Sequence, residues 1–148
     1  RPEDEPLMDE LLRTSSENTL MMRFFRKLSD MPHDQLTKYC HVDYDRELSF
    51  VAVMREGDSE KIIGEVRMST LPDQENAEMA VIVGDEWQGK GIGKALCLQC
   101  IKIARESGIK KMWMEILQVN ARMLYQAEKM GFKKIISDND SVNVVLDL

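Results

Sequence analysis

The first half of the chain reads as short amphipathic helices separated by polar residues. Residues 6–13, PLMDELLR, place apolar side chains on one helical face, and their proline suits the first turn of a helix. A second helix is predicted after SSEN, where Ser15 or Ser16 can cap it, and it continues into the apolar MMRFF. A third helix is predicted to begin at MPHDQLTKYC, residues 31–40.

From residue 47 the spacing of apolar residues changes to the alternation typical of strands. We predict three meandering strands, a helix from Gly91 to about Glu106, a strand, a helix that Gly131 stops, and two final strands. The strands cover residues 47–56, 61–70, 77–84, 110–117, 132–137 and 141–148, the helix before Gly131 covers 120–130, and turns fall at Gly57, 71–76 and 138–140. This order predicts a mixed α/β sheet with helices packed on it rather than a repeating βαβ barrel.

The composition is that of one globular domain. The chain has 148 residues, 43% apolar and 31% charged, and no repeat or linker divides it. No apolar run approaches the roughly 20 residues of a membrane span, and there is no signal-peptide pattern, so we expect a cytoplasmic protein without a membrane partner. The net charge of -6 argues against a nucleic-acid partner. Because the first residue is Arg1, we expect a domain processed or cut from a longer chain.

Cys97 and Cys100 form a C-x-x-C pair, a spacing that occurs in redox and zinc sites. They also fall on one apolar stripe at helical spacing. No second pair of ligands accompanies them, and His33 and His41 are distant in the sequence. We therefore interpret both cysteines as reduced core residues and expect no metal site.

The clearest functional signal is the glycine-rich stretch GDEWQGKGIGK at 84–94, which follows an apolar strand and opens a helix. Its first residues fit the opening of a P-loop, but Gly91 stands where a Ser or Thr should hold magnesium. The dinucleotide fingerprint fits Gly89 and Gly91 but finds Lys94 where its third glycine belongs. Neither phosphate motif is matched.

What remains is the physics that both motifs share. The first turn of a helix presents unpaired N–H groups and the positive end of the helix dipole. Glycines let a bulky anion approach the backbone closely. The loop is therefore predicted to be an anion cradle, best suited to a pyrophosphate. The alternative is a tight strand-to-helix turn that merely requires glycine.

Two motifs carry a resemblance to a known family. Residues 88–93, QGKGIG, match the acetyl-CoA motif Q/R-x-x-G-x-G/A, and Asn120 followed by Gly131 and Phe132 resembles the N-x(10)-GF helix of the GNAT superfamily of N-acetyltransferases. The order of elements is also similar over nearly the whole chain. The resemblance implies acetyl-CoA as co-substrate and the GNAT fold, an α/β fold with a mixed, mostly antiparallel central sheet flanked by helices. The usual first strand of that fold would lie at or before Arg1, and we expect it to be missing or truncated.

The resemblance also implies roles for particular residues. In that family the amides of the glycine loop bind the CoA pyrophosphate, and the preceding strand hydrogen-bonds the pantetheine arm. The strand residues are then Val81, Ile82 and Val83, and the loop residues are Gln88, Gly89, Lys90, Gly91, Ile92, Gly93 and Lys94. Asn120 would reach the cofactor from the start of the next helix, where it also suits an N-cap; capping alone is the alternative.

Glu78 is the candidate general base, because an amine must lose a proton before it attacks a thioester. A carboxylate within the apolar strand NAEMAVIV would be desolvated, which raises its pKa toward a value useful for a base. Alternation places Glu78 on one face with Ala80 and Ile82. The alternative is a solvated acid at the start of a strand. Histone-type lysine acetyltransferases of this superfamily carry their base in an A-E-I/V/M strand about ten residues before the loop. Glu78 lies ten residues before Gln88, so the resemblance favours the base.

One position departs from the family pattern. Many members have a tyrosine four residues before the GF glycine, thought to protonate the departing CoA thiolate, and here that position is Ala127. Tyr125 is two residues away, which turns it by about 200° on a helix. We assign no acid role to Tyr125 and expect a packed or exposed aromatic.

The segments RPEDEPLM, MMRFF and HVDYDRELSFVAV resemble the bacterial Pat-type protein lysine acetyltransferases, which modify a lysine of acetyl-CoA synthetase and related acyl-CoA synthetases. The resemblance implies direct acetyl transfer to a protein lysine, with Glu78 accepting a proton through a water. Cys97 and Cys100 are expected to be buried away from the thioester. Two other functions stay open: acetylation of a small amine, such as a polyamine or aminoglycoside, and non-catalytic sensing of acyl-CoA.

Overall fold

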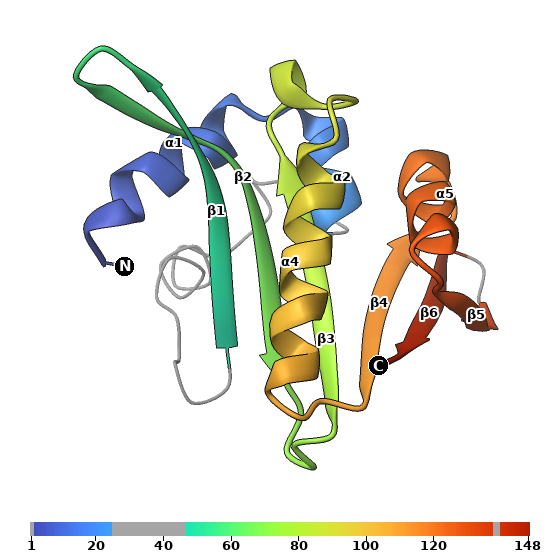
Figure 1. The fold of residues 1–148 in the computed structure, drawn as a ribbon. Coiled ribbons are helices and arrows are strands. Elements are labelled where there is room, and N and C mark those ends of the chain that lie inside the picture. Colours follow the sequence, from blue (N-terminus) through green and yellow to red (C-terminus); the bar gives the residue numbers. More distant parts are fainter. Residues whose placement is uncertain (1, 25–46, 138–139) are drawn as a thin grey trace.

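The computed structural model of the chain describes residues 2–24, 47–137 and 140–148. The described residues form helices on both faces of one sheet (Figure 1). In chain order the elements are η1 (Pro2–Asp4), α1 (Glu5–Thr14), α2 (Glu17–Phe24), β1 (Glu47–Glu56), β2 (Ser59–Thr70), β3 (Asn76–Val83), η3 (Asp85–Trp87), α4 (Ile92–Glu106), β4 (Lys111–Leu117), α5 (Ala121–Lys129), β5 (Lys133–Ser137) and β6 (Ser141–Asp147). The predicted strands and the predicted helices in the described residues are confirmed, with bounds shifted by one or two residues.

Local sequence signals explain where the helices begin and end. The Ser16 side chain accepts a hydrogen bond from the Thr19 amide at 3.1 Å, so Ser16 rather than Ser15 caps α2. Gly108 and Gly131 follow α4 and α5 with φ values of 83° and 100°, a left-handed conformation that favours glycine and stops a helix. The predicted helix at 31–40, Cys40, both histidines and most of the predicted 138–140 turn lie outside the described residues.

The sheet has the strand order β1-β2-β3-β4-β6-β5. Every neighbouring pair is antiparallel except β3 and β4, which are parallel. The predicted mixed, mostly antiparallel sheet is therefore confirmed. The parallel pairing is short: it joins Asn76 to Lys111, Ala77 to Met112 and Glu78 to Trp113, and no later residue pair links the two strands in the described part of the chain. The carboxyl-terminal halves of β3 and β4 consequently separate.

Two apolar layers cover the sheet. On one face α4 packs on β2 and β3, and the main core joins Met79 of β3 to the buried Cys97 and Cys100 of α4. On the other face Ile82 of β3 packs with Leu11 of α1 and other apolar residues of the first two helices. Met79 and Ile82 thus lie on opposite faces, as strand alternation requires. The prediction that Cys97 and Cys100 are reduced core residues is confirmed.

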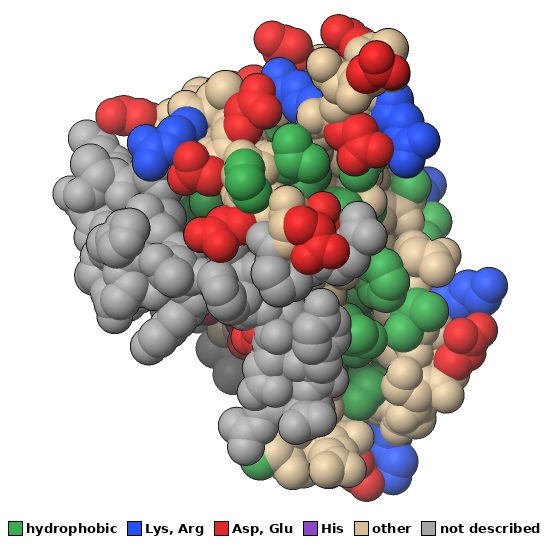
Figure 2. Space-filling model, turned by 90° about the vertical axis from the view of Figure 1, so that its left-hand side faces the viewer, with side chains coloured by type: hydrophobic (Ala, Val, Ile, Leu, Met, Phe, Trp, Pro, Cys, Tyr) green, Lys and Arg blue, Asp and Glu red, His purple; other side chains and the backbone are tan. Residues whose placement is uncertain are grey.

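The edge formed by β1 is partly apolar. Val51 and Val53 are both exposed on this strand, and Figure 2 shows the corresponding side of the molecule, where charged side chains of both signs surround hydrophobic ones. Within residues 2–24, 47–137 and 140–148, no helix is long and apolar enough to cross a membrane.

Candidate functional site

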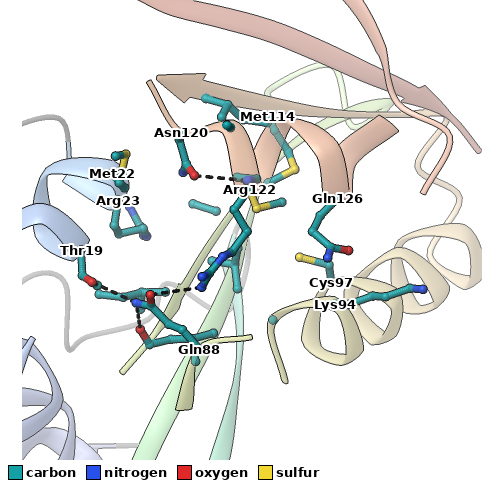
Figure 3. A pocket seen from close by; sticks show the side chains of 18 of the residues that line it. Thr19, Met22, Arg23, Gln88, Lys94, Cys97, Met114, Asn120, Arg122 and Gln126 are labelled. Carbon is teal, nitrogen blue, oxygen red and sulfur yellow. Dashed lines mark hydrogen bonds between the residues drawn. The ribbon is translucent and has the colours of Figure 1, made fainter. Parts of the chain in front are cut away.

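A cavity of about 550 Å³ opens where β3 and β4 separate. This volume lies within the usual range of small-molecule sites. The walls come from five segments that are distant in the sequence, namely α2, β3, the glycine loop with the start of α4, β4, and the start of α5 (Figure 3). Of the residues predicted for the cofactor, the cavity is lined by Val81, Ile82, Val83, Gln88, Gly89, Gly91, Gly93, Lys94 and Asn120.

The glycine loop turns the chain sharply into α4. Gly89 and Gly91 have φ values of 75° and 86°, and Gly91 is the residue that precedes the first turn of α4. A Cβ at either position would point into open space, so glycine is required there for its backbone conformation and not to relieve a clash. In the described structure, the amides of residues 89–94 have no hydrogen-bond acceptor. The loop therefore forms a cradle of free N–H groups at a helix N-terminus, which fits a diphosphate.

The strand that leads to the loop has one free edge. Val81, Ile82 and Val83 pair with β2 on one side. On the other side, no strand of the described residues pairs with them, and all three line the cavity. A free strand edge offers backbone N–H and C=O groups to an extended ligand. This edge fits the amide-containing pantetheine arm of CoA.

The side chain of Gln88 is hydrogen-bonded within the protein and holds the loop in place, so it is not available to bind a ligand. Its Nε2 donates to Thr19 Oγ1 at 2.9 Å and to the Val83 carbonyl at 3.0 Å, while its Oε1 accepts from Arg122 Nη1 at 3.4 Å (Figure 3). Both N–H groups of the carboxamide are thus used within the protein. Gln88 lines the cavity as predicted, and its side chain ties the loop to α2, β3 and α5.

Asn120 does two things at the start of α5. Its Oδ1 accepts the Met123 amide at 3.2 Å, so the predicted N-cap is confirmed. The same residue lines the cavity, and its side-chain nitrogen has no acceptor within the described ranges. The cap therefore leaves a donor available to a bound ligand.

Two loop residues face away from the cavity. Lys90 places its ammonium over the Trp87 ring, 5.1 Å from the centroid, a distance that suits a cation–π contact. Ile92 Cγ2 lies 3.5 Å from the position that a Cβ on Gly64 would occupy, so its side chain faces the sheet. Neither side chain lines the cavity, and these two residues can contribute their amides alone.

Glu78 stands where the strand pairing ends, and it is exposed. Of the two alternatives that the sequence left open, a desolvated carboxylate and a solvated acid at the start of a strand, the structure shows the solvated one. Glu78 also does not line the cavity, whereas Glu115 of β4 does. Glu115 Oε1 accepts a hydrogen bond from Ser141 Oγ at 2.9 Å. Nothing in the local sequence around Glu115 indicated this second carboxylate.

Cys97 borders the cavity, although it is fully buried. The expectation of burial is confirmed, and the expected distance from the thioester stays a prediction. Burial, with a smaller contribution from Cys100, raises the pKa of the Cys97 thiol to about 12. The thiol is thus protonated at neutral pH and is a poor nucleophile.

The helix α5 turns its tyrosine away from the cavity. Tyr125 is 57% exposed, and Lys129 stacks on its ring at 5.2 Å. Ala127 is buried in the core, while Met123 and Gln126 line the cavity. Of the packed or exposed aromatic predicted at Tyr125, the structure shows the exposed one.

Several lining residues carried no sequence signal. They come from α2, β4 and α5 and reach the cavity because of how those elements pack, and the charged and polar ones are Asn18, Thr19, Arg23, Glu115, Arg122 and Gln126. None of them is a defining position of the two cofactor motifs, although Asn18 and Arg23 lie in the segments SSEN and MMRFF.

Comparisons with known proteins agree with this geometry. The model of the acetyltransferase (GNAT) family matches residues 9–132. An acetyltransferase of Pseudomonas aeruginosa is 25% identical over 145 residues, which cover 98% of this chain and 78% of that protein. The GNAT domain of Streptomyces lividans PAT superposes with a TM-score of 0.86 at 23% identity, over 99% of this chain and 86% of that one. PaiA N-acetyltransferase of Thermoplasma acidophilum, solved with coenzyme A, gives a TM-score of 0.71 at 20% identity, over 99% and 94% of the two chains.

Proposed function

The chain belongs to the GNAT family of acetyltransferases, and from this premise we propose that it transfers acetyl from acetyl-CoA to the side-chain amine of a protein lysine. Membership of the family makes the chain an acetyl-CoA-dependent N-acetyltransferase. The proposed acceptor is a lysine of the kind that Pat-type enzymes modify, on an acyl-CoA synthetase. Two observations support this acceptor: the Pat-like motifs of the sequence and the similarity in fold to the Streptomyces lividans PAT domain.

The observation that carries the proposal is the continuity of the cavity. At one end lie the free amides of the glycine loop and the free edge of Val81–Val83. The same cavity is also lined by residues of α2, which contacts the loop through Thr19, and by Glu115 of β4. In this arrangement the loop holds the diphosphate, the strand edge holds the pantetheine arm, and the thioester reaches the point where β3 and β4 separate. An acceptor amine then enters from the side of α2.

The proposed chemistry is direct transfer. Glu78, at the point of separation, accepts the proton of the acceptor ammonium through a water molecule. The neutral amine nitrogen forms a bond to the acetyl carbonyl carbon, and the bond between that carbon and the CoA sulfur breaks. The nitrogen gives its surplus proton to water, which leaves a neutral amide, and the departing thiolate takes up a proton from water. Since the Cys97 thiol has a pKa of about 12, it is protonated and unsuited to a covalent acyl-enzyme step.

A labelled acetyl-CoA assay tests the acceptor. The protein is incubated with labelled acetyl-CoA and, in parallel, with folded AMP-forming acyl-CoA synthetases, with polyamines and aminoglycosides, and with no acceptor. The proposal expects label on one synthetase lysine, located by mass spectrometry, and its loss when that lysine is changed to arginine. Transfer to small amines alone would support a small-amine acetyltransferase. Binding of CoA with no transfer to any acceptor would support an acyl-CoA sensor.

A further inference from the structure

The hydroxyl group of Thr19 joins α2 to the glycine loop. It donates to Asp85 Oδ1 at 2.8 Å and accepts from Gln88 Nε2 at 2.9 Å and from Ser16 Oγ at 3.2 Å. A hydroxyl has one donor and two acceptor sites, so every site of this group is used. Thr19 is 8% exposed, and these contacts link residues that lie 66 and 69 positions apart.

The Val83 carbonyl fixes which way the Gln88 carboxamide points. The Val83 carbonyl can only accept, so the group 3.0 Å from it must be the nitrogen of Gln88. The second N–H of that nitrogen then points at Thr19 Oγ1, and the oxygen turns toward Arg122. The side chain of Gln88 is thus held from three sides at the residue that begins the loop.

The position of Gln88 matters because the free amides follow it directly. Gly89 and Gly91 have no side chains to anchor the loop, and their left-handed backbone is accessible to glycine in many other arrangements. The loop is therefore oriented from its two ends, by the bonds of Gln88 at one end and by α4 at the other. Thr19 supplies one of the bonds of Gln88 from an element that carries no cofactor motif.

We propose that Thr19 is a positioning residue for the acetyl-CoA loop, which acts through Gln88 to hold the amides of residues 89–94 in the orientation that binds a diphosphate. This inference rests on the proposed role of the loop in holding CoA. Thr19 also ties that orientation to α2, the helix whose Asn18, Met22 and Arg23 line the same cavity.

The test compares Thr19→Val with Thr19→Ser. Valine keeps the shape and loses the hydroxyl, while serine keeps the hydroxyl. Calorimetry with CoA is expected to give a Kd about fivefold to tenfold higher for T19V, in line with the loss of one or two buried hydrogen bonds, and a Kd within about twofold of the wild type for T19S. In steady-state kinetics T19V should raise KM for acetyl-CoA while kcat changes little.

Two further variants sharpen the result. In a Gln88→Leu background, T19V is expected to add no further loss, because the partner through which it acts is gone. Ser15→Ala removes a neighbouring hydroxyl that donates to the Leu11 carbonyl at 2.7 Å and does not contact the loop. This control is expected to leave the CoA affinity unchanged.

The outcomes separate positioning from plain stability. If T19V unfolds at a lower temperature yet binds CoA as tightly as the wild type, the positioning role is wrong, and an equal loss in the Gln88→Leu background would equally contradict it. Thr19→Ala, which also lacks the hydroxyl, provides the same comparison if T19V does not fold. Absence of binding heat in the wild-type protein would instead overturn the proposed cofactor site itself.

Discussion

Glu78 and Trp113 form the last residue pair between β3 and β4, and beyond them the two strands separate. The Trp113 Nε1 group donates to Asn76 Oδ1 at 2.8 Å, which fastens the two strands together just before the separation. Glu78 also faces Ser69 of β2 across the antiparallel register. The backbone of Glu78 therefore lies at the paired end of the opening between β3 and β4, and its side chain is exposed beside the cavity rather than lining it.

This position leads to a prediction for Glu78→Gln. Without a carboxylate to accept the proton of the acceptor ammonium, kcat is expected to fall by roughly 10²-fold to 10³-fold while the Kd for CoA stays the same. Steady-state kinetics with the identified acceptor and calorimetry with CoA check the two halves. Glu75→Gln is a matched control, since Glu75 is exposed and pairs with Lys110 at 2.9 Å on a turn. Full turnover by E78Q would remove Glu78 from the mechanism.

Gly91→Ala separates the ligand role of the loop from its backbone role. Alanine at a φ of 86° costs about 1–2 kcal/mol of stability, and it disturbs the cradle of amides. Gly57 lies in the β1–β2 turn, far from the cavity, with a φ of 61° and open space where a Cβ would point. Alanine there should cost a similar amount of stability through the backbone conformation alone. Urea unfolding should show similar losses for G91A and G57A, whereas only G91A weakens CoA binding. Equal CoA affinities for the two variants would favour a merely structural glycine turn.

The two core cysteines are predicted to be unreactive in the folded protein. Burial raises the pKa of Cys97 and of Cys100 to about 12, so a fraction on the order of 10⁻⁵ of each thiol is ionised at pH 7. Peptide mass spectrometry after iodoacetamide treatment should find both cysteines unmodified in native protein and alkylated in urea. An acetyl group on Cys97 after incubation with acetyl-CoA would contradict direct transfer.

Asp85 makes the contact between α2 and the loop sensitive to acid. Partial desolvation disfavours its charge, but hydrogen bonds from Ser16 and Thr19 outweigh this effect and hold the pKa below its usual 3.8. Because the folded pKa is the lower one, the stabilisation is present above about pH 4 and is lost as the pH falls from there through the folded pKa. Urea unfolding at a series of acidic pH values should show this decline, and Asp85→Asn should reduce it. An unchanged acid dependence in D85N would assign the decline to other carboxylates.

The local sequence was sufficient to predict most of the fold and the position of the glycine loop that borders the cavity. Alternation located β1 through β3, and Gly108 and Gly131 marked the ends of α4 and α5, because a left-handed residue is a local requirement. The loop of residues 88–94 was predicted for the same reason, since a strand, alternating glycines and a helix N-terminus lie next to one another in the chain. The N-cap at Asn120 is equally local.

What the sequence could not supply depends on contacts between distant segments. The sequence left open whether Glu78 is desolvated or solvated, because exposure depends on which element covers a strand face. The structure leaves Glu78 exposed, whereas its neighbours Ala77 and Met79 lie in the core on the opposite face. Glu115 and Arg122 reach the cavity because β4 leaves β3 after three residue pairs. Thr19 meets Gln88 across 69 residues because α2 packs beside β3. The chain by itself thus determined the elements and the glycine-rich turn into α4, which follow from backbone preferences of adjacent residues. The tertiary structure decided which side chains surround that loop, since packing of the whole sheet sets those distances.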